Sequence, residues 1–520
     1  MKKYFTFLLE KEKTIKFLLI IYTFYCSYKI GMSWDESYYH QIGEINLKYL
    51  LSFGQIYEPF FSKYRYSTLY WSISSLISQI VPNKFSIEIY HIINTFFGLM
   101  TIVGLHKINK ILFNKTIAKI ASLLLFCTPF FFGHLAINNK DIILAFAHIW
   151  IIYYVYKYTF NTYKFKRKLF LIFKISILSA LGTGIQLVFL GSLIPIVLIF
   201  LSIIFLSKKK NIKTFFFDFI IFFLLFYIIL ILFWVDTHND ILTLPFEFFV
   251  KTFSMSIGWP FNLLNGLYFE TNETPAYYLL VNYFYKLPEF IIVLYLISIP
   301  VLFFNRKFLL YNFKNFKNII IIILCLLIYP NLLVIFLPYP IYDGLRLFLW
   351  STPYLVIIPS LTIYLIFKKN NYVYKLIKVF LFFLVCFHIF NFLTITPYHY
   401  TFLNYFSGAK EYRYKKFEND YWSTSLKELI LSSNLVGDKI DFYSCGVSPE
   451  LTKIYMKKRY KRSEFTSREK ASYVIMTNRT LFSKKENKIS NCYDEYNSEN
   501  VHQIIRNGMI LSAIKKNNNE

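Results

Sequence analysis

The 520-residue sequence has little charge for its length, since only 17% of its residues are charged whereas 56% are hydrophobic. A soluble domain averages roughly 25% charged and 45–50% apolar residues, so this composition excludes an ordinary soluble protein and, for most of the chain, disorder. Six cysteines are too few for a disulfide scaffold. The phosphate-binding loops GxxxxGK[ST] and GxGxxG are both missing, which argues against a nucleotide-driven pump. These absences leave the class of integral membrane proteins.

Uncharged apolar runs of about 20 residues predict a mainly α, polytopic membrane protein with about eleven transmembrane helices. The Gly182–Gly184 break favours two spans over one kinked helix, because 39 residues would form a helix of about 58 Å, nearly twice the hydrocarbon thickness. The predicted spans are residues 15–33, 88–106, 117–133, 141–156, 169–182, 186–207, 214–234, 288–305, 318–337, 347–367 and 376–395.

Lysine and arginine gather in alternate loops, and this asymmetry predicts the orientation of the chain. With eleven spans, the N-terminus and every basic loop are cytoplasmic, and the C-terminus is extracytoplasmic. The net charge of +27 is then largely topological, so no nucleic-acid partner is expected. The first span has no small-residue cleavage site after it and is read as an uncleaved helix. The basic loops contain residues 107–119, 164–168, 208–213, 306–317 and 368–375.

The composition changes near Pro397, and charged residues with short β-like runs follow. We therefore expect a transmembrane domain at 1–396 and a small extracytoplasmic α/β domain at 397–520. Cys445 and Cys492 both lie in the second domain. An oxidising compartment would permit a disulfide between them, but two unpaired thiols are equally compatible with the spacing.

An acidic pair, Asp35 and Glu36, follows the first span directly. Carboxylates at a membrane boundary are costly unless they bind a cation or take up a proton. One of them could act as a general base or as a ligand of a hard divalent cation. The alternative is that both only cap the start of a helix. The aromatic residues that follow make Tyr39 and His40 candidate substrate contacts.

A second polar segment precedes the fourth predicted span and contains Asn138, Lys140 and Asp141. Asp141 lies on the same side of the membrane as Asp35, so the two carboxylates could converge on one acceptor hydroxyl or on a metal ion. Lys140 could meet a phosphate, and Asn138 is a candidate substrate contact. The alternatives are an N-cap for Asp141 and a lysine that reaches the interface.

A third polar segment, Tyr342-Asp343-Gly344-Leu345-Arg346, lies between the ninth and tenth predicted spans. Arg346 lies at the outer edge of the membrane, where short loops carry few positive residues. An arginine at such a position is a candidate phosphate ligand. A local ion pair between Asp343 and Arg346 is the alternative, and both can hold at once. Tyr342 is a further candidate substrate contact. The outer loop 235–287, which includes Trp259, fits a lid over a lipid-borne or sugar substrate, or an interfacial aromatic belt.

Together these motifs resemble the GT-C membrane glycosyltransferases, and more closely the protein-mannosyltransferase-like group, glycosyltransferase family 39. The stretch Thr396-Pro397-Tyr398-His399-Tyr400 and the stretch Phe417-Glu418-Asn419-Asp420-Tyr421-Trp422 are similar to a run found in one bacterial branch. The resemblance covers residues from about 33 to 425. Two departures are a neutral Ser37-Tyr38-Tyr39 where a basic residue often follows the acidic pair, and a neutral Gln186 where Arg or Lys often stands.

The resemblance implies an inverting transfer of a sugar from a polyprenyl-phosphate carrier to a lipid, glycan or protein acceptor. The reaction would take place on the extracytoplasmic face of a bacterial inner membrane. Asp35 would be the catalytic carboxylate, with Glu36 beside it and Asp141 as a second acid. Donor-phosphate contacts would come from Lys140, Arg346, Asp343 and Gln186. A divalent cation held by Asp35 and Asp141 stays open.

Two other functions compete with this reading. A transporter or flippase of lipid-linked glycans would place ionisable groups near the bilayer midplane, commonly in repeated halves, and neither pattern is evident. A non-catalytic membrane scaffold that presents the C-terminal domain is the third reading.

Overall fold

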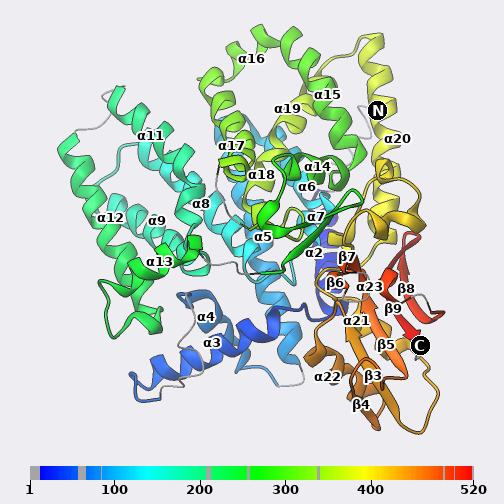
Figure 1. Cartoon of the computed structure of the whole chain (residues 1–520). Coiled ribbons are helices and arrows are strands. Elements are labelled where there is room, and N and C mark those ends of the chain that lie inside the picture. Colours follow the sequence, from blue (N-terminus) through cyan, green and yellow to red (C-terminus); the bar gives the residue numbers. More distant parts are fainter. Residues whose placement is uncertain are drawn as a thin grey trace.

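The computed structural model describes residues 12–56, 66–82, 85–206, 212–254, 258–336, 340–483, 487–496 and 498–517. A helical body precedes a C-terminal sheet, which lies at one corner of the molecule in Figure 1. The helices of the body are α2 (Glu12–Lys29), α3 (Glu36–Leu51), α4 (Leu69–Ser78), α5 (Ser86–Leu112), α6 (Lys115–Phe126), α7 (Pro129–Phe132), α8 (Asp141–Phe160), α9 (Phe165–Ile185), α10 (Phe189–Ser192), α11 (Ile194–Leu206), α12 (Ile212–Leu232), α13 (Leu244–Ser254), α14 (Tyr278–Lys286), α15 (Glu289–Phe304), α16 (Arg306–Asn312), α17 (Phe316–Phe336), α18 (Thr352–Leu355), α19 (Ile357–Lys368) and α20 (Tyr372–Thr394).

Within the described residues, seven helical segments are long and apolar enough to cross a membrane, or eight if the bent pair α14–α15 is counted as one span. The chain is therefore an integral membrane protein. The most apolar 18-residue window of α8 is 72% buried inside the protein, whereas that of α12 is only 17% buried. Hence α8 lies at the centre of the body, and α12 presents its apolar side chains to lipid.

The predicted count of eleven spans is not confirmed. The run at 117–133 forms the 12-residue α6 and then a separate turn, α7, because Pro129 cannot continue the ladder of α6. The run at 186–207 is divided between α10 and the 13-residue α11. Gly182 and Gly184 both lie inside α9, and the break comes one residue after its end, at Gln186. Residues 208–210 of the predicted basic loops lie outside the described residues.

The C-terminal part contains a five-stranded mixed sheet in the order β4-β3-β5-β9-β8. Strand β3 is parallel to β4 and β5, whereas β9 is antiparallel to β5 and β8. Cys445 and Cys492 form a disulfide with a Cα–Cα distance of 5.8 Å. The elements of this part are α21 (Leu426–Ser432), β3 (Ile440–Cys445), α22 (Pro449–Arg459), β4 (Ser463–Phe465), β5 (Tyr473–Thr477), β6 (Thr480–Ser483), β7 (Lys488–Asn491), α23 (Cys492–Glu495), β8 (Asn500–Arg506) and β9 (Met509–Lys516).

The segment between α20 and α21 joins the sheet to the helical body. Backbone amides of Gly31 and Trp34 donate to the carbonyls of Thr424 (3.2 Å) and Trp422 (3.1 Å). A Cβ atom on Gly133 would lie 2.0 Å from the backbone nitrogen of Tyr400, so only glycine permits this close approach. A hairpin of β1 (Phe261–Leu264) and β2 (Leu267–Glu270) lies against the same segment through a bridge from Leu264 to Phe417.

Candidate functional site

The two residues of the acidic pair point to different partners. One Glu36 carboxylate oxygen accepts a hydrogen bond from the Ser33 backbone amide (2.5 Å), and the other lies 3.0 Å from His91 Nε2. The Glu36 side chain is almost fully buried, whereas the Asp35 side chain is 39% exposed. Asp35 precedes α3 but makes no capping hydrogen bond with its side chain. The carboxylate that is open to a substrate is therefore that of Asp35.

The Asn138–Asp141 turn is fixed by its own polar groups. The Asn138 side-chain oxygen accepts from the backbone amides of Lys140 (3.2 Å) and Asp141 (2.8 Å), and its amide group donates to Asp141 Oδ2 (3.0 Å). Asn138 thus satisfies amides at the start of α8, which is the role that an N-cap would have. The Asp141 carboxylate is left to face the interior, where its Oδ1 has no hydrogen-bond partner among the described residues.

The third motif forms a tight turn before the 3-10 helix η5 (Arg346–Ser351). Asp343 and Gly344 both have left-handed backbones, with φ of +59° and +67°. The positive φ of Gly344 favours glycine at this position, and the end of the Lys286 side chain packs against it. The Tyr278 hydroxyl accepts a hydrogen bond from the Gly344 amide (2.8 Å). The turn places the Asp343 carboxylate and the Arg346 guanidinium next to each other.

Arg346 is the centre of the site and brings all three motifs together. Its guanidinium lies 2.9 Å from Asp343 Oδ2 through Nη1, 3.5 Å from Asp35 Oδ2 through Nη1, and 3.6 Å from Asp141 Oδ2 through Nε. It also donates to the Tyr342 hydroxyl (3.2 Å). The Arg346 side chain is only 5% exposed, and its Nε makes no hydrogen bond to any residue that the structure describes. The predicted Asp343–Arg346 pair therefore exists, inside a larger buried network.

A second arginine comes from the C-terminal part. Arg479 follows β5 and contacts Asp343 Oδ1, and its Nη1 lies 3.5 Å from Glu418 Oε2. The Arg479 guanidinium lies 4.5 Å from the centroid of the Trp259 ring. Burial raises the pKa of the Glu418 carboxyl. Burial disfavours the charge of Arg479, but Asp343 and Glu418 more than compensate and raise its pKa. The buried Lys286 lies on the other side of the same turn.

Lys140 occupies an aromatic environment beside this network. Its ammonium group donates to the Tyr66 hydroxyl (3.3 Å) and lies 4.9 Å from the Tyr66 ring centroid and 5.5 Å from that of Tyr39. Tyr39 in turn stacks on Trp71. Among the described residues, Lys140 has no carboxylate within 4.0 Å of its nitrogen. It is therefore a half-buried cation whose charge is available to an anion.

His134, to which the sequence analysis gave no role, supports the aromatic wall of the site. Its Nδ1 lies 2.5 Å from the Phe130 carbonyl oxygen, which can only accept, so Nδ1 carries the proton. Nε2 then accepts a hydrogen bond from the Tyr421 hydroxyl (2.8 Å). Burial lowers the pKa of His134 to about 3, so the ring stays neutral. The adjacent Trp422 ring lies 4.8 Å from the Arg346 guanidinium.

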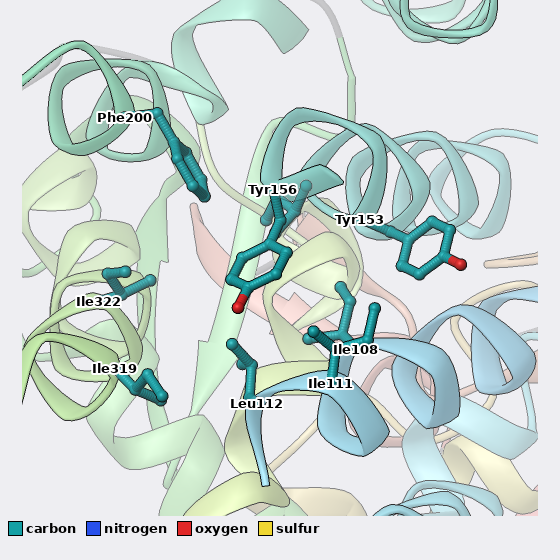
Figure 2. A pocket seen from close by; sticks show the side chains of 9 residues that line it. Ile108, Ile111, Leu112, Tyr153, Tyr156, Phe200, Ile319 and Ile322 are labelled. Carbon is teal, nitrogen blue, oxygen red and sulfur yellow. The ribbon is translucent and has the colours of Figure 1, made fainter. Parts of the chain in front are cut away.

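Like Glu36, the predicted site residues His40 and Gln186 are not brought to Arg346. The His40 ring stacks on Tyr90 at a centroid distance of 3.6 Å. Gln186 lines a separate, mostly apolar cavity of about 480 Å³, which also contacts Ile341 and Leu347 on either side of the Arg346 turn. Another cavity, of about 30 Å³ and shown in Figure 2, is too small for a substrate. Its lining residues are Ile108, Ile111, Leu112, Ile152, Tyr153, Tyr156, Phe200, Ile319 and Ile322.

The predicted acids do not fit a metal ion. In the part of the chain that the structure describes, no group of three or more His, Cys, Asp or Glu side chains could hold one. The Arg346 guanidinium contacts both Asp35 and Asp141, so it takes the place that a cation between these carboxylates would need.

Several solved structures are similar to this chain, and three of them are described. ArnT from Cupriavidus metallidurans in the apo state aligns over 98% of this chain and 99% of its own, with 9% identity and a TM-score of 0.51. ArnT bound to undecaprenyl phosphate aligns over 97% and 98%, with 9% identity and a TM-score of 0.49. The Archaeoglobus fulgidus oligosaccharyltransferase in the apo form aligns over 89% of this chain and 69% of its own, with 11% identity and a TM-score of 0.43.

No protein-family model matches the sequence, and no curated protein matches it either. The full-length structural alignment with apo ArnT shows a common fold, and at 9% identity it shows nothing finer. The resemblance inferred from the sequence motifs is thereby confirmed at the level of architecture. The chain has the fold seen in the structure of apo ArnT.

Proposed function

We propose that this protein is a glycosyltransferase that moves a sugar from a polyprenyl-phosphate carrier to an acceptor hydroxyl on the extracytoplasmic face of the membrane. The observation that carries the proposal is the half-exposed Asp35 carboxylate beside the buried Arg346 network. Lys140, which lies next to Asp141 and has no carboxylate partner among the described residues, adds a cation to this place. A base, a cation for a leaving group and a membrane fold are the parts that this reaction needs.

Asp35 acts as the general base in this account. The acceptor oxygen attacks the anomeric carbon of the sugar while its proton passes to the Asp35 carboxylate. The bond between that carbon and the phosphate oxygen breaks, and polyprenyl phosphate leaves with the electron pair. A single displacement of this kind inverts the anomeric centre. Arg346, 3.5 Å from Asp35, holds the carboxylate in place.

Lys140 is the main contact of the leaving phosphate. Arg346 already faces three carboxylates, whereas no carboxylate of the described residues lies within 4.0 Å of the Lys140 ammonium group, which contacts the Tyr66 hydroxyl and the rings of Tyr39 and Tyr66. A phosphate that approaches Lys140 gains a cation without displacing a carboxylate. The Arg346 Nε lies 3.6 Å from Asp141 Oδ2 but makes no hydrogen bond within the described residues, and it supplies a second donor.

The cavity of about 480 Å³ beside Gln186 receives the first part of the lipid tail. Its lining is mainly apolar and includes Phe249 and Leu333. Undecaprenyl phosphate, the lipid bound in one ArnT structure, makes polyprenyl phosphates the first carriers to test. A bacterial inner membrane, with the N-terminus cytoplasmic, is the location that we propose from the basic loops.

The test uses membranes that contain this chain and a panel of radiolabelled polyprenyl-phosphate sugars. We expect cleavage of at least one donor, with release of polyprenyl phosphate and transfer of label to an acceptor. Movement of an intact donor across the membrane, with no cleavage, would favour a flippase instead.

A further inference from the structure

The seven tryptophans of the chain, all within the described residues, differ sharply in burial. Five of them, Trp71, Trp150, Trp234, Trp350 and Trp422, are at most 5% exposed. Only Trp34 and Trp259 are partly exposed, and these two lie in edge-to-face contact with ring centroids 5.7 Å apart. They come from segments 225 positions apart, so the fold has brought its two accessible tryptophans together beside Asp35.

Both tryptophans are held in place by neighbouring protein groups. The Trp259 indole N–H donates to the Thr480 carbonyl (2.9 Å), and the Arg479 guanidinium covers one side of its ring. A Cβ atom on Gly258 would lie 2.3 Å from the Tyr342 ring, so the backbone before Trp259 rests on the ring that contacts Arg346. Trp34 is anchored by its backbone amide on the Trp422 carbonyl. The aromatic surface is therefore built in advance of any ligand.

A membrane-interface belt would explain exposed tryptophans in general, but it does not explain this pair. An interfacial tryptophan presents its N–H to water or lipid headgroups, whereas the N–H of Trp259 is spent on Thr480. A rigid aromatic surface beside one open carboxylate instead matches a sugar ring. The C–H groups of a pyranose face pack on the indole, and a hydroxyl reaches the carboxylate.

We propose that Trp34 and Trp259 form a carbohydrate subsite that binds the acceptor, so that the acceptor is a glycan. This inference rests on the proposed function, because it uses Asp35 as the base. The donor phosphate is placed at Lys140, whose contacts are Tyr39 and Tyr66. The tryptophan pair is instead held by Thr480 of the C-terminal part and by Trp422 of the segment before α21. We therefore assign it to the acceptor and not to the donor.

The kinetic test compares Trp34→Ala, Trp259→Ala and the aromatic replacements Trp34→Phe and Trp259→Phe, with buried Trp150→Phe as the matched control. Acceptors are methyl glucopyranoside, methyl mannopyranoside, chito-oligosaccharides and a Ser/Thr peptide. We expect the alanine variants to raise the KM for a sugar acceptor at least tenfold, to leave the donor KM unchanged, and to be rescued largely by phenylalanine. A raised donor KM, or transfer to the peptide alone with unchanged KM, would overturn the assignment.

Tryptophan fluorescence gives a reading that does not depend on turnover. Because five tryptophans are buried, acrylamide quenching reports mainly on Trp34 and Trp259. We expect a saturating sugar acceptor to protect the wild type from quenching and to have no such effect on the Trp34→Phe, Trp259→Phe double variant. Protection by lipid vesicles or by the peptide, and not by any sugar, would overturn the subsite. If wild-type protein cleaves no donor while sugars still protect it, the proposed function fails and the subsite stands as a binding site.

Discussion

Asp35 and Glu36 show how adjacent residues of the same chemistry receive different tasks. Helix α3 begins at Glu36, and successive helical side chains are turned by about 100°. Glu36 is directed to Ser33 and His91, and Asp35 to Arg346. We therefore assign the reaction to Asp35 and a structural task to Glu36.

Lys140 provides the clearest prediction at the residue scale. Replacing it with Met should raise the KM for the lipid donor and lower kcat/KM about 10- to 100-fold, because a hydrogen bond to a charged group contributes roughly 1.5–3 kcal/mol. Lys157→Met is the matched control, since Lys157 lies at the opposite end of α8 over the Tyr153 ring. An unchanged donor KM in Lys140→Met would remove this residue from phosphate binding.

Most of the residues that gather around Arg346 were predictable from their local motifs. Each motif sits at a break between an apolar run and a polar turn, where a carboxylate or a cation is conspicuous. Arg479 was not predictable, because it stands 133 positions from Arg346 in a segment of ordinary composition. Glu418 stood in a motif similar to the family pattern, but nothing in the sequence gave it a partner. His40 and Gln186 do not contact Arg346. His40 lies one turn into α3, and Gln186 directly follows the end of α9, so both side chains point to other neighbours.

At the scale of elements, the turn after β5 connects the sheet to the site through Arg479. We expect Arg479→Gln to lower kcat and thermal stability together, because removing one partner of a buried ion pair costs about 3–5 kcal/mol. Arg479→Lys should restore only part of both, since lysine lacks the planar fork that spans Asp343 and Glu418. Steady-state kinetics and thermal melting measure the two effects. Wild-type kcat in Arg479→Gln would show that the sheet is not needed to position the site.

The disulfide fastens the end of β3 to the start of α23. The bond closes a loop of 47 residues, and in the chain-entropy account such a loop is worth about 4 kcal/mol. The double variant Cys445→Ser, Cys492→Ser should therefore melt at a lower temperature, and Arg479, which lies inside the loop, should lose part of its contacts. Cys386→Ser, at an exposed free cysteine, is the control. Equal melting temperatures for the double variant and the control would contradict this role.

Helices were predictable where an apolar run is long and uninterrupted, as in α12, α17 and α20. The prediction was less successful where polar or proline residues divide a run. The stretch at 117–133 meets Pro129, and the run at 288–305 is joined to α14 by a bend of 111°. A hydropathy scale measures how favourably side chains transfer from water to lipid. It therefore finds apolar runs but does not show where the backbone bends inside the protein. The division of the chain at residue 397 stays a prediction.

At the scale of the whole molecule, the network around Arg346 predicts that transfer needs no divalent cation. Arg346 lies between the carboxylates that a metal ion would bridge, and the described residues offer no other cluster of ligands. We expect EDTA to leave the rate of sugar transfer within twofold. Loss of activity in EDTA, restored by Mg²⁺ or Mn²⁺, would show that a metal ion displaces Arg346 during the reaction.

The central claim is that the exposed carboxylate of Asp35 is the general base of sugar transfer. Purified protein in lipid nanodiscs tests this claim most directly. The measurement is release of polyprenyl phosphate, with formation of glycosylated acceptor, by wild type, Asp35→Asn and Glu36→Gln at equal protein levels. A general base contributes about 10²–10⁴-fold, so Asp35→Asn should lose activity by that factor. Glu36→Gln should keep most of the turnover and melt at a lower temperature. Equal turnover by wild type and Asp35→Asn would contradict the account.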